Sequence, residues 1–253
     1  MNLENIIHQG LREGYELDVS FNLVEDEFSH SMIEYLLTVS IAKRIKNYFD
    51  DESIHGYKII LEYSLIQFYL NCFPLKYEEF EDNNPFIIRT IYRVIDGLQK
   101  NQKRLDIALI GIDNNRTFYG IELKGINPKK KKKLDDLDRL AIGYENVSNM
   151  IDSSLENCFF GYIYNPSSKN KIYNNSHDSI KLIESVIEID KNAFELNHPT
   201  LVIESTYEIL KESTSDNFNK EFDFDEVTRL TGIIFSVLYK IVKKELTPQL
   251  KIV

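Results

Sequence analysis

The sequence predicts a mixed α/β fold on three observations. Segments with strand-like patterns recur between longer segments with helical apolar spacing. Residues 104–124 have the pattern of two strands joined by a polar turn at Asp113, Asn114 and Asn115, residue types that favour tight turns. No internal repeat or composition break divides the 253 residues. We therefore expect a single domain over residues 1–253, with a central mixed sheet flanked by helices and helical additions at both ends.

The segments before residue 104 are expected to be largely helical. Ser29 or Ser31 caps a helix that runs to about Phe49 and is apolar almost all round, which predicts that it is buried. Residues 57–73 are rich in β-branched and aromatic side chains, but their length suits a strand or a helix equally. Residues 86–98 likewise fit either a helix or a strand that leads into the hairpin.

After the hairpin, alternating strand and helix patterns continue. The sequence predicts an amphipathic helix to about 151, a strand over 158–164, a helix over 179–189 and a strand over 200–204. Asp223 and Glu226 have capping-box spacing, which predicts a last long helix to about Glu245. The core is therefore expected over about residues 29–205, followed by a C-terminal helical addition over about 206–253.

The hairpin separates apolar from charged side chains. Period-two alternation places the apolar residues on one face: Leu105, Ile107 and Leu109 on the first strand, and Tyr119, Ile121 and Leu123 on the second. A three-residue loop sets Ile107 opposite Ile121 and Asp106 opposite Glu122. Asp106, Glu122 and Lys124 then gather on the other, outward face within cross-strand distance. A slip of one residue would disrupt both faces at once.

This arrangement resembles a known family. Asp106, fifteen further residues and then Glu122-Leu123-Lys124 resemble the motif of the PD-(D/E)xK nuclease superfamily. Residues 124–128 and 135–140 look like the strand exit and next helix of such nucleases. Leu105 stands in place of the proline of the family's name, at a position that varies in the family. The resemblance covers about residues 89–150 and implies a restriction-endonuclease-like core.

The resemblance implies metal-dependent hydrolysis of phosphodiester bonds. Asp106 and Glu122 are expected to bind Mg²⁺ or Mn²⁺ together with the backbone carbonyl of Leu123, since these ions prefer hard oxygen ligands. Lys124 is expected to position the attacking water or to stabilise the transition state. Members of the family often carry an acidic residue on a helix ahead of the sheet, which makes Glu34 a further catalytic candidate. A buried Glu34 needs a partner, either the metal's water or an Arg or Lys.

Positive charge is concentrated around this motif although the formal net charge of the chain is −10. Residues 89–139 hold 13 Lys/Arg and 7 Asp/Glu, a balance of +6, and the remainder of the chain holds 17 and 33. The candidates for phosphate contact are Lys129, Lys130, Lys131, Lys132, Lys133 and Arg104. A solvated loop is the simpler interpretation of the lysine run. Arg139 either contacts phosphate or, by its spacing, pairs with Asp135 on its own helix.

Other classes of protein lack their signatures here. Two distant cysteines, Cys72 and Cys158, form no disulfide framework or CxxC site, and the five histidines show no zinc-hydrolase spacing. No phosphate-binding GxxxxGK[ST] motif is present. No signal peptide and no run of about 18 to 20 apolar residues is evident, so we expect a cytoplasmic protein without a membrane.

The sequence thus predicts a nuclease acting on DNA, with RNA as an alternative substrate, working as a homodimer or with a partner protein. The resemblance places it in bacterial restriction or anti-phage defence, by association only. The alternative is a nucleic-acid-binding or scaffolding subunit of a defence or repair complex, in which cleavage is weak or depends on a partner.

Overall fold

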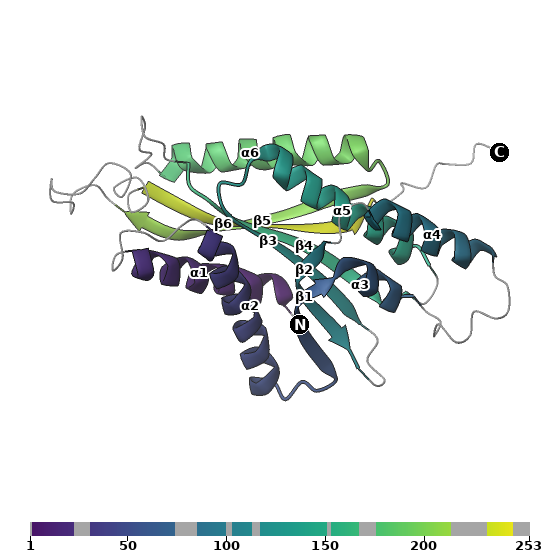
Figure 1. Ribbon diagram of the computed structural model, residues 1–253. Helices are drawn as coiled ribbons and strands as arrows, with labels where there is room; N and C mark the ends of the chain where they lie inside the picture. Colours follow the sequence, from purple (N-terminus) through teal and green to yellow (C-terminus); the bar gives the residue numbers. More distant parts are fainter. Residues whose placement is uncertain are drawn as a thin grey trace, which may run out of the picture.

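The structure is a computed structural model that describes residues 2–22, 31–73, 85–99, 103–112, 117–150, 153–166, 176–213 and 232–244. The helices within them are α1 (Leu3–Asn22), α2 (Ser31–Asp51), α3 (Leu65–Asn71), α4 (Pro85–Gln99), α5 (Lys130–Ser148) and α6 (Ser176–Asn197). The strands are β1 (Tyr57–Ser64), β2 (Arg104–Gly111), β3 (Phe118–Ile126), β4 (Leu155–Tyr164), β5 (Leu201–Ser213) and β6 (Gly232–Lys243). The predicted mixed α/β class is confirmed (Figure 1).

The strands of the described residues form one six-stranded sheet in the order β1-β2-β3-β4-β6-β5. β2 pairs antiparallel with both β1 and β3. β4 is parallel to β3, and α5 forms the crossover between them, as a parallel pair requires. β6 lies between β4 and β5 and is antiparallel to both. The hairpin of β2 and β3 is therefore central rather than peripheral.

Helices cover both faces of the sheet, with α1 and α2 on one side and α5 and α6 on the other (Figure 1). The side chains of β4 show this division, since Phe159 and Ile163 pack toward α1 and α2, whereas Phe160 and Tyr162 pack in the cluster that includes α3 to α6. A charged side chain on a central strand is consequently covered by helices, whichever face of the sheet it lies on.

The predicted hairpin register is confirmed over residues 107–110, where Ile107 lies opposite Ile121. The predicted turn at residues 113–115 lies outside the described residues. Residues 57–73 resolve into β1 followed by α3, which Ser64 caps by accepting a hydrogen bond from the backbone N–H of Gln67. The segment 86–98 is helical, as part of α4.

The predicted C-terminal helical addition is wrong, because residues 201–213 and 232–243 are strands of the central sheet. β6 is apolar along nearly its whole length since both of its faces are buried, and such a run has no period-two alternation. Its β-branched and aromatic residues favour a strand. Asp223 and Glu226, the expected capping pair, lie outside the described residues.

Candidate functional site

Asp106 lies where the side-chain alternation of β2 is interrupted. Leu105 packs in the cluster with α3, α4 and α5, whereas Ile107 packs with α1 and α2, so the expectation that they share a face is wrong. The neighbouring strand β1 is irregular at the same level, because Glu62 has φ 52°. The backbone N–H of Leu123 donates to Asp106 Oδ2 at 2.5 Å and holds this carboxylate against β3.

Glu122 and Lys124 lie on the face of β3 that α5 covers. They are only 4% and 6% exposed, so the expected outward face is wrong. Lys124 Nζ lies 3.0 Å from Glu122 Oε1 and donates to the carbonyl oxygen of Leu123 at 2.8 Å. The ammonium group therefore stands beside two of the three groups that the sequence assigned to a metal.

Asp136 of α5 completes this charged group and was not among the predicted site residues. Its Oδ2 lies 3.2 Å from Lys124 Nζ, its Oδ1 lies 3.6 Å from Lys103 Nζ, and the residue is 2% exposed. Helical spacing could have identified it, because it belongs to the buried stripe of α5: Lys133, Asp136, Leu137, Leu140, Ala141, Tyr144 and Val147.

Arg139 joins α5 to the hairpin. Its Nη2 lies 3.2 Å from Glu122 Oε1 and also forms an ion pair with Asp136 Oδ1. The predicted partner on its own helix, Asp135, is therefore wrong by one position. A guanidinium that bridges two carboxylates from different elements fixes how α5 sits on β3.

Glu34 reaches the same end of β3 from α2, as the sequence predicted. Its Oε2 lies 4.0 Å from Lys124 Nζ and its Oε1 lies 3.7 Å from Lys132 Nζ. The backbone N–H of Gly125 also donates to Glu34 Oε1 at 3.4 Å. A side chain at Gly125 would place its Cβ 2.7 Å from Ile33 Cγ2, so a glycine there permits the close approach of α2. Glu34 is thus paired with two lysines and with the Gly125 N–H.

Burial shifts the ionisation of the two candidate ligands. Burial and, to a lesser extent, the Glu122 carboxylate raise the pKa of Asp106 to about 8, against the opposing effects of the Leu123 N–H and Lys124. Burial likewise raises the pKa of Glu122, although Lys124 and Arg139 counteract it. Asp106 therefore resists ionisation while Glu122 is charged.

The neighbouring ion pairs have the opposite effect. Burial lowers the pKa of Lys124, but Glu122 and Asp136 outweigh burial, and the net shift is upward. Burial raises the pKa of Asp136, but Lys124 and Arg139 outweigh it, and the net shift is downward. Lys124 is consequently a permanent cation at neutral pH and acts as a hydrogen-bond donor rather than as a base.

The lysine run is not a loop, because four of its five members begin α5. Lys133 is 4% exposed, and its ammonium forms an ion pair with Asp190 of α6. Lys132 faces Glu34. The exposed members that remain available to a phosphate are Lys129, Lys130 and Lys131. Arg104 is also exposed, and because β2 and β3 are antiparallel it lies at the same end of the hairpin as Lys124.

The ligand set fits a divalent cation. The hydrogen bonds described above engage Asp106 Oδ2 and Glu122 Oε1, which leaves a second oxygen on each carboxylate. Within the described part of the chain no group of three or more His, Cys, Asp or Glu side chains is placed to hold a metal. Mg²⁺ needs fewer, since it commonly binds one or two carboxylates and keeps several waters. Such an ion would also offset the repulsion that raises the pKa of Asp106.

Comparisons with protein-family models, with curated proteins and with solved structures found no match. In the residues that the structure describes, no helix is both long enough and apolar enough to cross a membrane.

Proposed function

We propose that the protein is a metal-dependent nuclease of the PD-(D/E)xK type that hydrolyses phosphodiester bonds in nucleic acid, with DNA as its main substrate. One observation carries the proposal: Asp106, Glu122, Lys124 and the carbonyl of Leu123 converge on a central hairpin whose register matches the one that the motif requires.

The surroundings of the hairpin support a restriction-endonuclease-like core. A mixed sheet has helices on both faces, β3 leads directly into α5, and α2 precedes the sheet with Glu34 pointing at the end of β3. These are the features that the resemblance implies. The sheet also includes β6 and the part of β5 beyond residue 205, where a helical addition was expected.

The roles of the residues follow from their contacts. Asp106 and Glu122 would hold a Mg²⁺ ion, and a bound ion supplies Lewis-acid stabilisation of phosphate charge and lowers the pKa of a coordinated water. Lys124, charged and held by Glu122 and Leu123, can donate to a phosphate oxygen or to the attacking water. Asp136 and Arg139 act through Lys124 and Glu122, and we assign them as positioning residues.

A binding or scaffolding role is the second candidate, and one observation favours it. Lys124 and Arg139 already neutralise Glu122, and such a buried network is also what a purely structural charge cluster requires. In that case the basic residues near the site would still bind nucleic acid.

A cleavage panel separates the two candidates. Labelled duplex, single-stranded and branched DNA and a single-stranded RNA are incubated with Mg²⁺, Mn²⁺ or EDTA. We expect cleavage with either ion and none in EDTA. Asp106→Asn and Glu122→Gln preserve side-chain size and should lower the cleavage rate at least about a hundredfold, since both carboxylates are assigned to the ion that stabilises the transition state.

Glu156→Gln on β4 is the matched control, because it removes an exposed strand carboxylate away from the charged group. It should leave the rate unchanged. If the wild-type protein binds DNA but cleaves nothing with either ion, the scaffolding role replaces the nuclease.

A further inference from the structure

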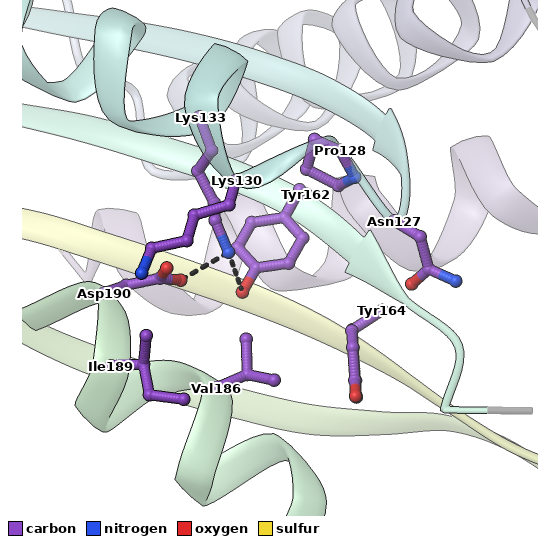
Figure 2. Close-up of a pocket in the computed structure, with 9 residues that line it drawn as sticks. All are labelled: Asn127, Pro128, Lys130, Lys133, Tyr162, Tyr164, Val186, Ile189 and Asp190. Atoms are coloured by element: carbon purple, nitrogen blue, oxygen red, sulfur yellow. Dashed lines mark hydrogen bonds and ion pairs between the residues drawn. The ribbon is translucent and has the colours of Figure 1, made fainter.

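A pocket of about 260 Å³ opens beside the candidate site, at the carboxyl ends of β3 and β4 (Figure 2). Tyr162 and Tyr164 of β4 line one side, and Ile189 of α6 lines the other. Its walls are thus mainly aromatic and aliphatic. The volume is slightly below the roughly 300 to 1,000 Å³ of pockets for drug-sized ligands, which suits a smaller, flat molecule.

The floor of the pocket is a buried ion pair. Lys133 and Asp190 are 4% and 1% exposed, and Lys133 Nζ also lies 4.7 Å from the ring centroid of Tyr162. Lys133 and the hydroxyl of Tyr239 both bond Asp190 Oδ2, the latter at 2.7 Å. The other oxygen, Asp190 Oδ1, is left to accept a hydrogen bond from a ligand, and Figure 2 shows this carboxyl group at the pocket.

The rim of the pocket is positively charged. Lys130 lines it, and exposed Lys129 and Lys131 flank Lys130 at the start of α5. Lys129 is the N-cap residue and makes no side-chain capping bond to the first turn. Helix N-termini favour anions, and the lysines add full charges. A flat ligand in the pocket would therefore be accompanied by an anionic group at the rim.

The pocket continues the catalytic face of the sheet. Glu122 lies opposite Phe160 in the β3–β4 register. Tyr162 is two residues after Phe160, so its side chain lies on the same face of the sheet as those of Phe160 and Glu122. Asn127, at the rim, is three residues from Lys124 and thus at most about 11 Å away along the chain. The side chain of Asn127 exchanges two 2.8 Å hydrogen bonds with the backbone of Asn165, which fixes this rim.

We propose that this pocket receives one unpaired nucleobase of the substrate strand next to the cleaved bond, with a phosphate of that strand at the lysines that begin α5. The inference rests on the proposed nuclease function and narrows its substrate class. Aromatic and aliphatic walls suit the faces of a base. Asp190 Oδ1 favours a base with an exocyclic amino group, as carboxylates do with cytosine.

The substrate must present that base outside a duplex stack. A paired base cannot enter a pocket without being flipped out, whereas a single-stranded or branched substrate already exposes one. We therefore expect the enzyme to act on nucleic acid that carries unpaired nucleotides at the cut.

The test uses the full chain in EDTA and the methyl NMR signals of Val186 and Ile189. The probes are dCMP, dTMP, deoxyribose 5-phosphate and inorganic phosphate. We expect dCMP to shift both methyl signals and to bind at least about fivefold more tightly than deoxyribose 5-phosphate, because a stacked base adds affinity. Binding of dTMP should be weaker than that of dCMP.

Ile189→Asp should abolish the preference for dCMP over deoxyribose 5-phosphate, as read from Val186. Leu196→Asp, a more exposed position on the same helix, is the matched control and should retain it. Equal affinities for all four probes would refute the proposal that the pocket binds a base. Equal effects of the two variants on the preference for dCMP would refute it as well.

The metal-free experiment is independent of cleavage. Cleavage without base-dependent binding would refute the base pocket and leave the nuclease. Base-dependent binding without cleavage would support the pocket as a nucleotide site and refute the nuclease.

Discussion

Lys124 stands among three carboxylates that come from three elements of the fold. Glu122 precedes it on β3, Asp136 comes from α5 and Glu34 from α2. Two of these pairs are almost fully buried, whereas Glu34 is 37% exposed. Because removing one partner from a buried pair leaves an uncompensated charge, the structural cost of losing Lys124 should far exceed that of losing Glu34.

We therefore predict that Lys124→Met destabilises the fold by about 3 kcal/mol, since it removes one of the two buried cations, Lys124 and Arg139, that pair with Glu122 and Asp136. Glu34→Gln, which breaks a half-exposed contact, should cost at most about 1 kcal/mol. Urea unfolding of both variants at pH 7 measures the difference. Equal stability of Lys124→Met and wild type would show that the buried network is not formed in solution.

Asp106 gives a prediction about pH. Its pKa rises from 3.8 to about 8 on folding, so its contribution to stability is fully present below about pH 4 and is lost as the pH rises toward 8. In EDTA, the free energy of unfolding of the wild type should fall across this window relative to that of Asp106→Asn. Urea unfolding at several pH values from 5 to 9 tests this. If the free energies of unfolding of the two proteins changed with pH in parallel, the pKa of Asp106 would not be raised on folding.

At the residue scale, the sequence predicted Asp106, Glu122, Lys124 and Glu34 as one group, and the structure brings them together. Strand alternation and a short loop determine which hairpin residues meet, so these could be predicted locally. Asp136 could not be placed in the same way. Its contact with Lys124 depends on how α5 is rotated over the sheet, and no local pattern determines that rotation.

At the element scale, the start of α5 has charges of the unfavourable sign. Four consecutive lysines occupy its first turn, where acidic residues are normally favourable. Asp190 and Glu34 neutralise Lys133 and Lys132, but Lys130 and Lys131 are exposed. A helix that tolerates this arrangement is well suited to binding an anion.

We predict that Lys131→Glu stabilises the protein by about 0.5 kcal/mol, because it places a negative charge at the helix N-terminus. The same change should weaken DNA binding and flatten its dependence on log salt by about 0.9, if this lysine contacts a phosphate. Thermal unfolding and a salt titration of DNA affinity measure the two effects.

The matched control is Lys181→Glu, which makes the same charge change beyond the first turn of α6. It should give neither effect. A stabilised Lys131→Glu protein with unchanged affinity and salt slope would show that Lys131 does not contact a phosphate, although its charge is unfavourable at the N-terminus of α5.

Elements with a distinct local pattern could be predicted from the sequence, and β6 could not. The hairpin and the start of α2 follow from local patterns, whereas β6 was expected to be a helix. Its sequence is a continuous apolar run, and such a run suits a buried helix or a strand covered on both faces. Its position between β4 and β5 in the sheet determines that this segment is a strand.

At the scale of the whole molecule, the sheet has one continuous order that extends past the site on both sides. β4 pairs with β3 along one edge and with β6 along the other, so the C-terminal strands contact the hairpin of β2 and β3 only through β4. A removable helical addition would leave the hairpin unaffected by loss of the C-terminal region. Because β6 lies inside the sheet, loss of the C-terminal region should instead destabilise the hairpin.

Amide hydrogen exchange distinguishes these cases. Core strands exchange only through global unfolding, whereas edges open locally at lower free energy. We predict that amides of β6 are as well protected as those of β3 and β4, and that amides of β1, an edge strand, exchange faster. Added urea should accelerate β3, β4 and β6 together, with one common dependence on denaturant. If β5 and β6 exchanged as a separate unit of lower stability while β3 stayed protected, the C-terminal strands would be an independent addition, and the sheet order would not describe the protein in solution.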